Sequence, residues 1–213
     1  MQQGTLEGTD PIGLGAIFTL LVVMLGPFKI IGPFKQLTAG IDDTTTRQVS
    51  LLAFVYSLGT VVLGGFLGKV LLHNWGVSVP ALLIAGGIIF FLVGLSLVLE
   101  QYHAEHPSLV PLPAAPTPAA LRITFPLVVT PYGIAAVIVL LSNSHHAART
   151  ISILAIMVAV MILNLLAMLY ARRTGGGALL VLSIFGAVLG VLQVALAVEM
   201  IVRGLRGLGV LDG

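Results

Sequence analysis

The chain has 213 residues, of which 58% are hydrophobic and only 8% are charged, and its mean hydropathy is +1.11. The ten Lys and Arg and eight Asp and Glu leave a net charge of +2. Most of these charges lie at the ends of apolar runs, as membrane flanks do, so the basic balance does not indicate a nucleic-acid surface. The absence of cysteine excludes disulfides, thiolate zinc sites and iron–sulfur clusters. Since one span takes about 20 residues, the sequence predicts an all-α polytopic membrane protein with about six spans.

The apolar runs predict spans over residues 11–39, 48–72, 79–99, 122–142, 150–171 and 178–203. The N-terminal stretch carries Glu7 and Asp10 but no Lys or Arg. It therefore lacks the positive region of a cleavable signal peptide, and we expect the first run to be retained as a span. Five prolines in residues 101–121 predict an extended connection between the third and fourth spans. The chain, residues 1–213, is expected to form a single transmembrane domain.

The two halves of the chain resemble each other. Residues 47–55 match residues 149–157 at an offset of 102, and residues 26–30 parallel 130–134 at an offset of 104. Gly86 parallels Gly186 in the same order. We therefore predict a repeat over residues 11–100 and a second over 122–205. Three crossings change the side of the membrane, so the second repeat would be inverted, as in many secondary transporters. The alternative is chance similarity between helices rich in Leu, Ile and Val.

The first predicted span carries two Gly-Pro pairs near its centre, at residues 26–27 and 32–33. A continuous helix of this length would measure roughly 42 Å against about 30 Å of hydrocarbon, so it is expected to tilt steeply or break. Proline removes a backbone donor and favours the break. Lys29 lies between the pairs, where lysine usually faces a bundle interior and can bind an anion. The alternative is that its ammonium reaches the interface along a lipid-facing stem.

The fourth predicted span repeats this pattern with Pro126 and Pro131. Unwound backbone at that depth is tolerated only against protein or a water-filled cavity. Free amides at the start of a half-helix attract anions and free carbonyls at its end attract cations, so two facing breaks predict a site for a small zwitterion or anion. The alternative is that the prolines only kink their helices. The predicted substrate-binding residues are Gly26, Pro27, Lys29, Gly32, Thr130, Pro131, Tyr132 and Gly133.

Three further polar residues are weaker candidates for the same site. Asn164 lies in the middle of the fifth span, where a hydrogen bond between helices is the usual role and substrate contact the alternative. Glu199 has Arg203 one turn later, so an ion pair near a helix end explains it, with proton coupling as the alternative. Gln193 lies above Glu199 on the same span. No metal site is predicted, because the five histidines fall in connections without a completing carboxylate.

Basic residues at the predicted flanks bear on orientation. The Arg172-Arg173 pair and the acidic N-terminus favour a multi-pass inner-membrane protein with both termini outside. The glycines at positions 64 and 68 would pack against another helix, either within the monomer's bundle or in a homo-oligomer.

These features resemble the MarC family of integral membrane proteins, within the lysine-exporter-like superfamily. Residues 76–87 resemble the family's third-span signature, and residues 37–40 resemble the end of its first span. The family's first-span pattern, DPxGNxPxF, aligns with residues 26–34, and its fourth-span GPG aligns with residues 130–132. The first-span alignment keeps Pro27 and Phe34 but replaces Asp by Gly26, Gly by Lys29, Asn by Ile30 and the second Pro by Gly32.

The resemblance implies six spans in two inverted triplets and a transporter, since members of the family have been linked to small neutral amino acids. The first-span replacements remove a carboxylate and an amide and add an ammonium, so sodium coupling through these positions is not expected. The coupling ion is not identified.

We therefore expect a secondary transporter, working by alternating access on a small neutral amino acid or related carboxylate, with no cofactor. Its partners would be the lipid bilayer and an anionic or zwitterionic solute. The alternatives are a membrane scaffold or partner subunit that does not transport, or a passive channel. An enzyme is not predicted, because the sequence has no metalloprotease motif, nucleophile elbow or cysteine.

Overall fold

The computed structural model describes residues 13–99, 112–113, 115–144 and 146–211, and every regular element in those ranges is helical. The all-α prediction is therefore confirmed. The first span contains α1 (Leu14–Leu25), the short turn η1 (Pro27–Lys29) and α2 (Ile31–Leu37). The second and third spans are α3 (Asp43–Asn74) and α4 (Val79–Leu99). The fourth contains α5 (Pro116–Arg122), the irregular turn η3 (Ile123–Val128) and α6 (Pro131–Ser142). The last two are α7 (Ala147–Tyr170), followed by the turn η4 (Ala171–Arg173), and α8 (Gly176–Gly207).

The prediction of about six spans is confirmed by length and composition. Five helices are long and apolar enough to cross a membrane, and the pair formed by 116–128 and 133–142, bent by 64°, makes a sixth. Large apolar side chains cover the outer surface, and Leu63, Leu67 and Ile151 are each more than three-fifths exposed. Such a surface suits contact with lipid rather than with water.

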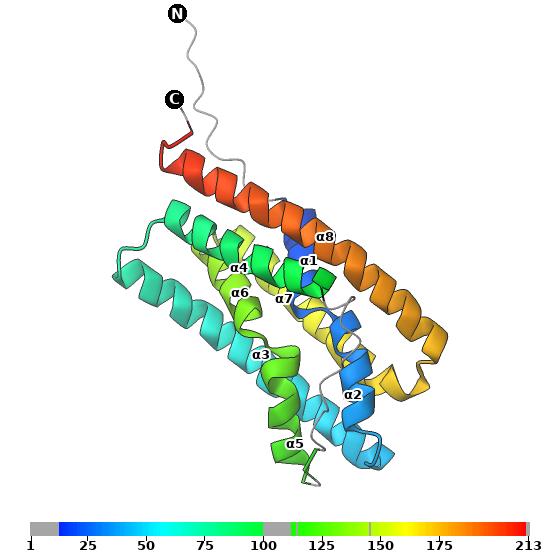
Figure 1. Cartoon of the computed structure of the whole chain (residues 1–213). Coiled ribbons are helices and arrows are strands. Elements are labelled where there is room, and N and C mark those ends of the chain that lie inside the picture. Colours follow the sequence, from blue (N-terminus) through cyan, green and yellow to red (C-terminus); the bar gives the residue numbers. More distant parts are fainter. Residues whose placement is uncertain (1–12, 100–111, 114, 145, 212–213) are drawn as a thin grey trace, which may run out of the picture.

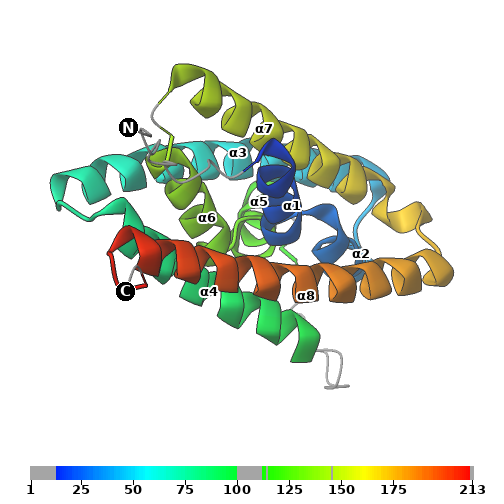
Figure 2. The same ribbon diagram turned by 90° about the horizontal axis from the view of Figure 1, so that it is seen from above.

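The two interrupted spans lie in the middle of the molecule. Seen from above, α1, α5 and α6 lie between a layer formed by α3 and α7 and a layer formed by α4 and α8 (Figure 2). The long axes of α4 and α8 run side by side for most of their length (Figures 1 and 2). Irregular backbone is thereby shielded from lipid on both sides, as its unpaired polar groups require.

Close packing of α4 on α8 depends on small residues. A Cβ added to Gly94 would lie 3.1 Å from the carbonyl oxygen of Gly190, and one added to Gly87 would lie 2.9 Å from that of Ala197. Between these contacts the side-chain amide of Gln193 donates to the carbonyl of Phe90, 103 residues earlier. The same offset of 103 residues relates Gly87 to Gly190 and Gly94 to Ala197. Adding it to one partner and subtracting it from the other therefore converts each of the two close contacts into the other one. This is the pairing that an inverted repeat would produce, although the repeat itself stays a prediction.

Two details differ from the sequence expectations. Gly32 and Pro33 do not interrupt a helix, because both lie within α2. Pro33 falls in the first turn of that helix, where a missing N–H is tolerated. For the same reason α5 begins at Pro116, inside the connection predicted over 101–121 and before the span predicted from residue 122. The rest of that connection, the N-terminal acids Glu7 and Asp10, and His103, His106 and His145 lie outside the described residues.

Candidate functional site

The break in the first span is centred on Gly26, as the sequence predicts. Its backbone is extended (φ −78°, ψ 165°) and separates α1 from the turn begun by Pro27. A Cβ at this position would lie 1.8 Å from the carbonyl oxygen of Val22, so only glycine fits here without a backbone shift. Because α1 ends at Leu25, its last carbonyls have no hydrogen-bond partner within the helix, and Pro27 has no N–H to offer one.

Two side chains supply donors to these carbonyls. The Lys29 ammonium donates to the carbonyl oxygen of Met24 at 2.8 Å. The Asn164 amide, on α7, donates to the carbonyl oxygen of Leu25. The negative end of α1 therefore meets one positive charge and one neutral donor inside the protein.

The break in the fourth span ends with an N-terminal cap on α6. Val129 and Thr130 are extended, and Pro131 occupies the first helical position. The Thr130 hydroxyl oxygen accepts a hydrogen bond from the Gly133 amide at 3.1 Å. Pro131 has no backbone N–H, and the N–H of Gly133 is bonded by the cap. Residues of α6 itself therefore leave few free N–H groups at the start of the helix.

The two breaks meet inside the bundle. A Cβ on Gly133 would lie 2.4 Å from Cδ2 of Leu25, which places the start of α6 directly against the end of α1. Leu25 and Asn164 are each 1% exposed and Thr130 is 8% exposed. The two predicted breaks therefore meet at Leu25 and Gly133, and the residues around this contact are buried.

Asn164 is a stronger candidate for the site in the structure than it is from the sequence alone. Its Oδ1 is buried and accepts no hydrogen bond from the described residues, while its Nδ2 holds the Leu25 carbonyl. A buried acceptor without a donor costs free energy, so such an atom in a native structure calls for an explanation. A bound solute carrying N–H groups would provide the donor. The available sequence signal was a single amide in the otherwise apolar run of residues 153–169.

Other predicted residues do not join this cluster. Gly32 faces open space on α2, with nothing within 4 Å of an added Cβ. Gln193 bonds the Phe90 carbonyl between α4 and α8. Glu199 forms an ion pair with Arg203 at 2.8 Å on the surface of α8, which agrees with the simpler interpretation of this residue. Tyr132 opens α6, but its side chain lies outside the described part of the structure.

In the ranges that the structure describes, no three His, Asp or Glu side chains gather as ligands. The groups assembled at the breaks are backbone carbonyls, one ammonium, one amide and one hydroxyl. Together they can bind a small polar molecule that carries both a donor group and an anionic group.

Comparison with known proteins gives one family. A family model described as "MarC family integral membrane protein" matches residues 13–209. The inner membrane protein MarC of Citrobacter koseri is 28% identical over 94 residues, which cover 44% of this chain and 42% of the relative. The MarC proteins of Salmonella arizonae and Escherichia coli K12 are also 28% identical, over 94 and 93 residues, covering 44% of this chain and 42% and 41% of those relatives. The aligned region thus spans less than half of these curated relatives. No solved structure matches the chain.

Proposed function

Because this chain belongs to the MarC family of integral membrane proteins, as a multi-pass protein of the inner membrane, we propose that it is a secondary transporter of a small solute. The observation that carries the proposal is the contact between two helix breaks in the interior, where Gly133 meets Leu25. Discontinuous helices crossing near the middle of a bundle are a common way to build a transport site.

The proposed substrate is a small neutral amino acid or a related carboxylate. Its ammonium group would donate to the carbonyls of Met24 and Leu25 and to the unpaired Oδ1 of Asn164. Its carboxylate would pair with Lys29, whose ammonium would leave the Met24 carbonyl as the substrate's own ammonium takes that place. This exchange keeps every buried charge partnered in both states, which lowers the penalty for emptying or filling the site.

Access to this site requires movement, because Leu25, Thr130 and Asn164 are buried. We propose that the half-helices α1 and α6 shift against the surrounding layers to open the breaks to one side and then the other. Gly26 and Thr130 would be the hinge positions, since the backbone is already extended at both.

The test is counterflow of labelled glycine and alanine in proteoliposomes, which does not require the coupling ion to be known. We expect labelled substrate to accumulate against unlabelled substrate inside, with saturation. Asn164→Leu should abolish the exchange, whereas the matched variant Asn74→Leu, at the exposed end of α3, should retain it.

Each alternative function predicts a different result. A passive channel would give flux without counterflow or saturation. A scaffold or partner subunit would give no exchange with either amino acid or with small organic acids, from protein that is folded. Either result would overturn the proposal.

A further inference from the structure

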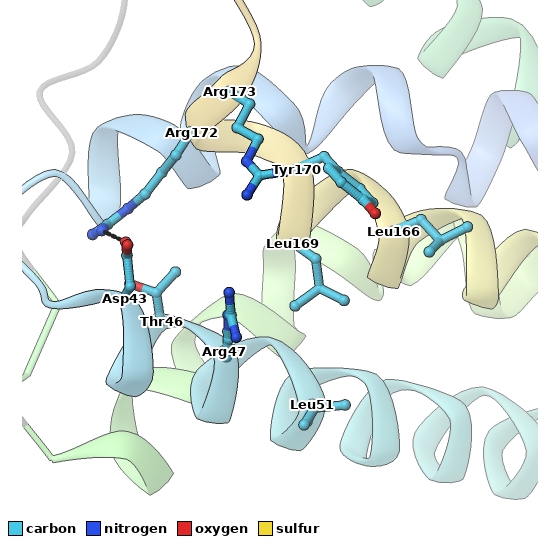
Figure 3. Close-up of a pocket in the computed structure, with 9 residues that line it drawn as sticks. All are labelled: Asp43, Thr46, Arg47, Leu51, Leu166, Leu169, Tyr170, Arg172 and Arg173. Carbon is cyan, nitrogen blue, oxygen red and sulfur yellow. Dashed lines mark hydrogen bonds and ion pairs between the residues drawn. The ribbon is translucent and has the colours of Figure 1, made fainter.

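A second feature, away from the helix breaks, is a groove of about 490 Å³ between the start of α3 and the end of α7. The groove lies where the span of α3 begins and the span of α7 ends, and therefore at the level of the membrane surface. The residues lining it are Asp43, Thr46, Arg47, Leu51, Leu166, Leu169, Tyr170, Arg172 and Arg173 (Figure 3). Three arginines against one aspartate make the groove basic.

The three arginines differ in their partners. Arg172 is held by the Asp43 carboxylate and by the backbone carbonyls of Thr38 and Ile41. Arg47 makes no hydrogen bond or ion pair with any residue that the structure describes. Arg173 lies over the Tyr170 ring at 5.9 Å, a contact that leaves its charge without a carboxylate. Figure 3 shows Arg47 and Arg173 extending into the groove from opposite sides.

The deeper wall of the groove is apolar. Leu51 lies two turns after the start of α3, and Leu166 lies one turn before the end of α7, so both are further into the membrane than the arginines. Leu51, Leu166 and Leu169 are between 38% and 51% exposed and continue the lipid-facing surface. The groove is thus cationic at the membrane surface and apolar below it, with an aromatic residue at the boundary.

We propose that this groove binds an anionic phospholipid, with the phosphate between Arg47 and Arg173 and an acyl chain along the three leucines. Arginine forms paired hydrogen bonds to phosphate oxygens, and basic pockets between spans at the membrane surface bind anionic headgroups. A soluble phosphate would use the same cations but would leave the apolar wall without a partner. The site is separate from the proposed transport site and does not depend on it.

The test is native mass spectrometry of the full chain in mild detergent, titrated with phosphatidylglycerol or with phosphatidylethanolamine carrying the same acyl chains. We expect the anionic lipid to bind more tightly, and Arg47→Ala to weaken its binding about fivefold, with a similar further loss in Arg47→Ala/Arg173→Ala. The single variant breaks no hydrogen bond or ion pair within the described protein, and Arg47 is exposed, so the variant should fold. The matched control Arg206→Ala, at the exposed end of α8, should bind as the wild type does.

Three outcomes would overturn the lipid site. Equal binding of the two lipids would show that the groove does not select an anionic headgroup, since both lipids carry a phosphate and only their net charge differs. An equal loss in the Arg206→Ala variant would reduce the effect to general electrostatics. Displacement of phosphatidylglycerol by inorganic phosphate or by glycerophosphoglycerol at equal concentration would assign the groove to a soluble anion.

Discussion

The two broken helices satisfy their free backbone groups in different ways. At the first break the carbonyls of Met24 and Leu25 are bonded by side chains, one of which comes from α7, 139 residues away. At the second break the amide of Gly133 is bonded by Thr130, three residues away in its own turn. A local cap re-forms whenever the helix does, whereas a distant donor can be displaced. We therefore expect a solute to enter by exchange at the first break, whereas the cap at the second break stays formed as α6 moves.

The largest effect is expected from Gly26→Ala, which adds a Cβ 1.8 Å from the Val22 carbonyl oxygen. The backbone has to shift at the first break, at a cost of about 3 kcal/mol or more, since overpacking beside backbone finds no side chain to move aside. Thermal unfolding in detergent measures the loss. Gly32→Ala is the matched control, because its Cβ meets open space inside α2 and alanine favours a helix. Equal stability of both variants would show that the break is not fixed by Gly26.

The next largest effect is expected where the side-chain donors at the first break are removed. Asn164→Leu and Lys29→Met should each destabilise the protein by about 1 to 2 kcal/mol, because each leaves a buried carbonyl unpaired. The two carbonyls are adjacent, so the double variant should depart from additivity. Chemical unfolding of the two single variants and the double variant completes the cycle. Strict additivity would separate the two donors and weaken the proposed exchange between them.

These expectations show how far the sequence leads. The Gly-Pro pair at 26–27 and the proline at 131 predict both breaks, since the loss of a backbone donor is a local property of proline. The second pair at 32–33 has the same composition but causes no break, because its position relative to the start of α2 decides whether the donor is needed. That position depends on where the first break ends, and composition does not supply it.

The partners of Lys29 and Asn164 could not be predicted in the same way. The sequence marks both as polar residues within spans, and it predicts that Lys29 faces a substrate anion. The structure gives its ammonium to a carbonyl of its own span. The residue that donates to the free carbonyls of α1 depends on how α7 packs against α1. That contact joins distant parts of the chain. An anion-binding role for Lys29 stays a prediction, which counterflow by the Lys29→Met variant would test.

A smaller effect is expected at the second break. Thr130→Val removes the cap of α6 while keeping the side-chain shape, and should cost about 1 kcal/mol, within the usual range for a lost helix cap. Thr130→Ser keeps the hydroxyl oxygen and should restore most of that stability. If Thr130 serves only as the cap of α6, Thr130→Ser should also exchange glycine at the wild-type rate in proteoliposomes. A serine variant that is stable but inactive would instead make the threonine methyl group part of the transport site.

The smallest effect separates a buried helix cap from an exposed one. At the start of α3 the Asp42 carboxylate accepts a hydrogen bond from the Thr45 amide, and this bond lowers the pKa of Asp42 below its usual value of 3.8. The ionised form is therefore favoured by folding, so its contribution to stability is present above the usual pKa and is lost as the pH falls through the lower, folded value. Thr130 does not titrate, so the cap of α6 should be independent of pH.

Asp42→Asn keeps a capping oxygen without a titrating group, and it should reduce the fall in melting temperature between about pH 6 and pH 3. Because Asp42 is fully exposed, solvent and salt screen its charge, and the difference should shrink further at high ionic strength. An unchanged pH dependence in Asp42→Asn would assign the acid sensitivity to other carboxylates at this end of the protein, with Asp43 beside Arg172 the first to be replaced.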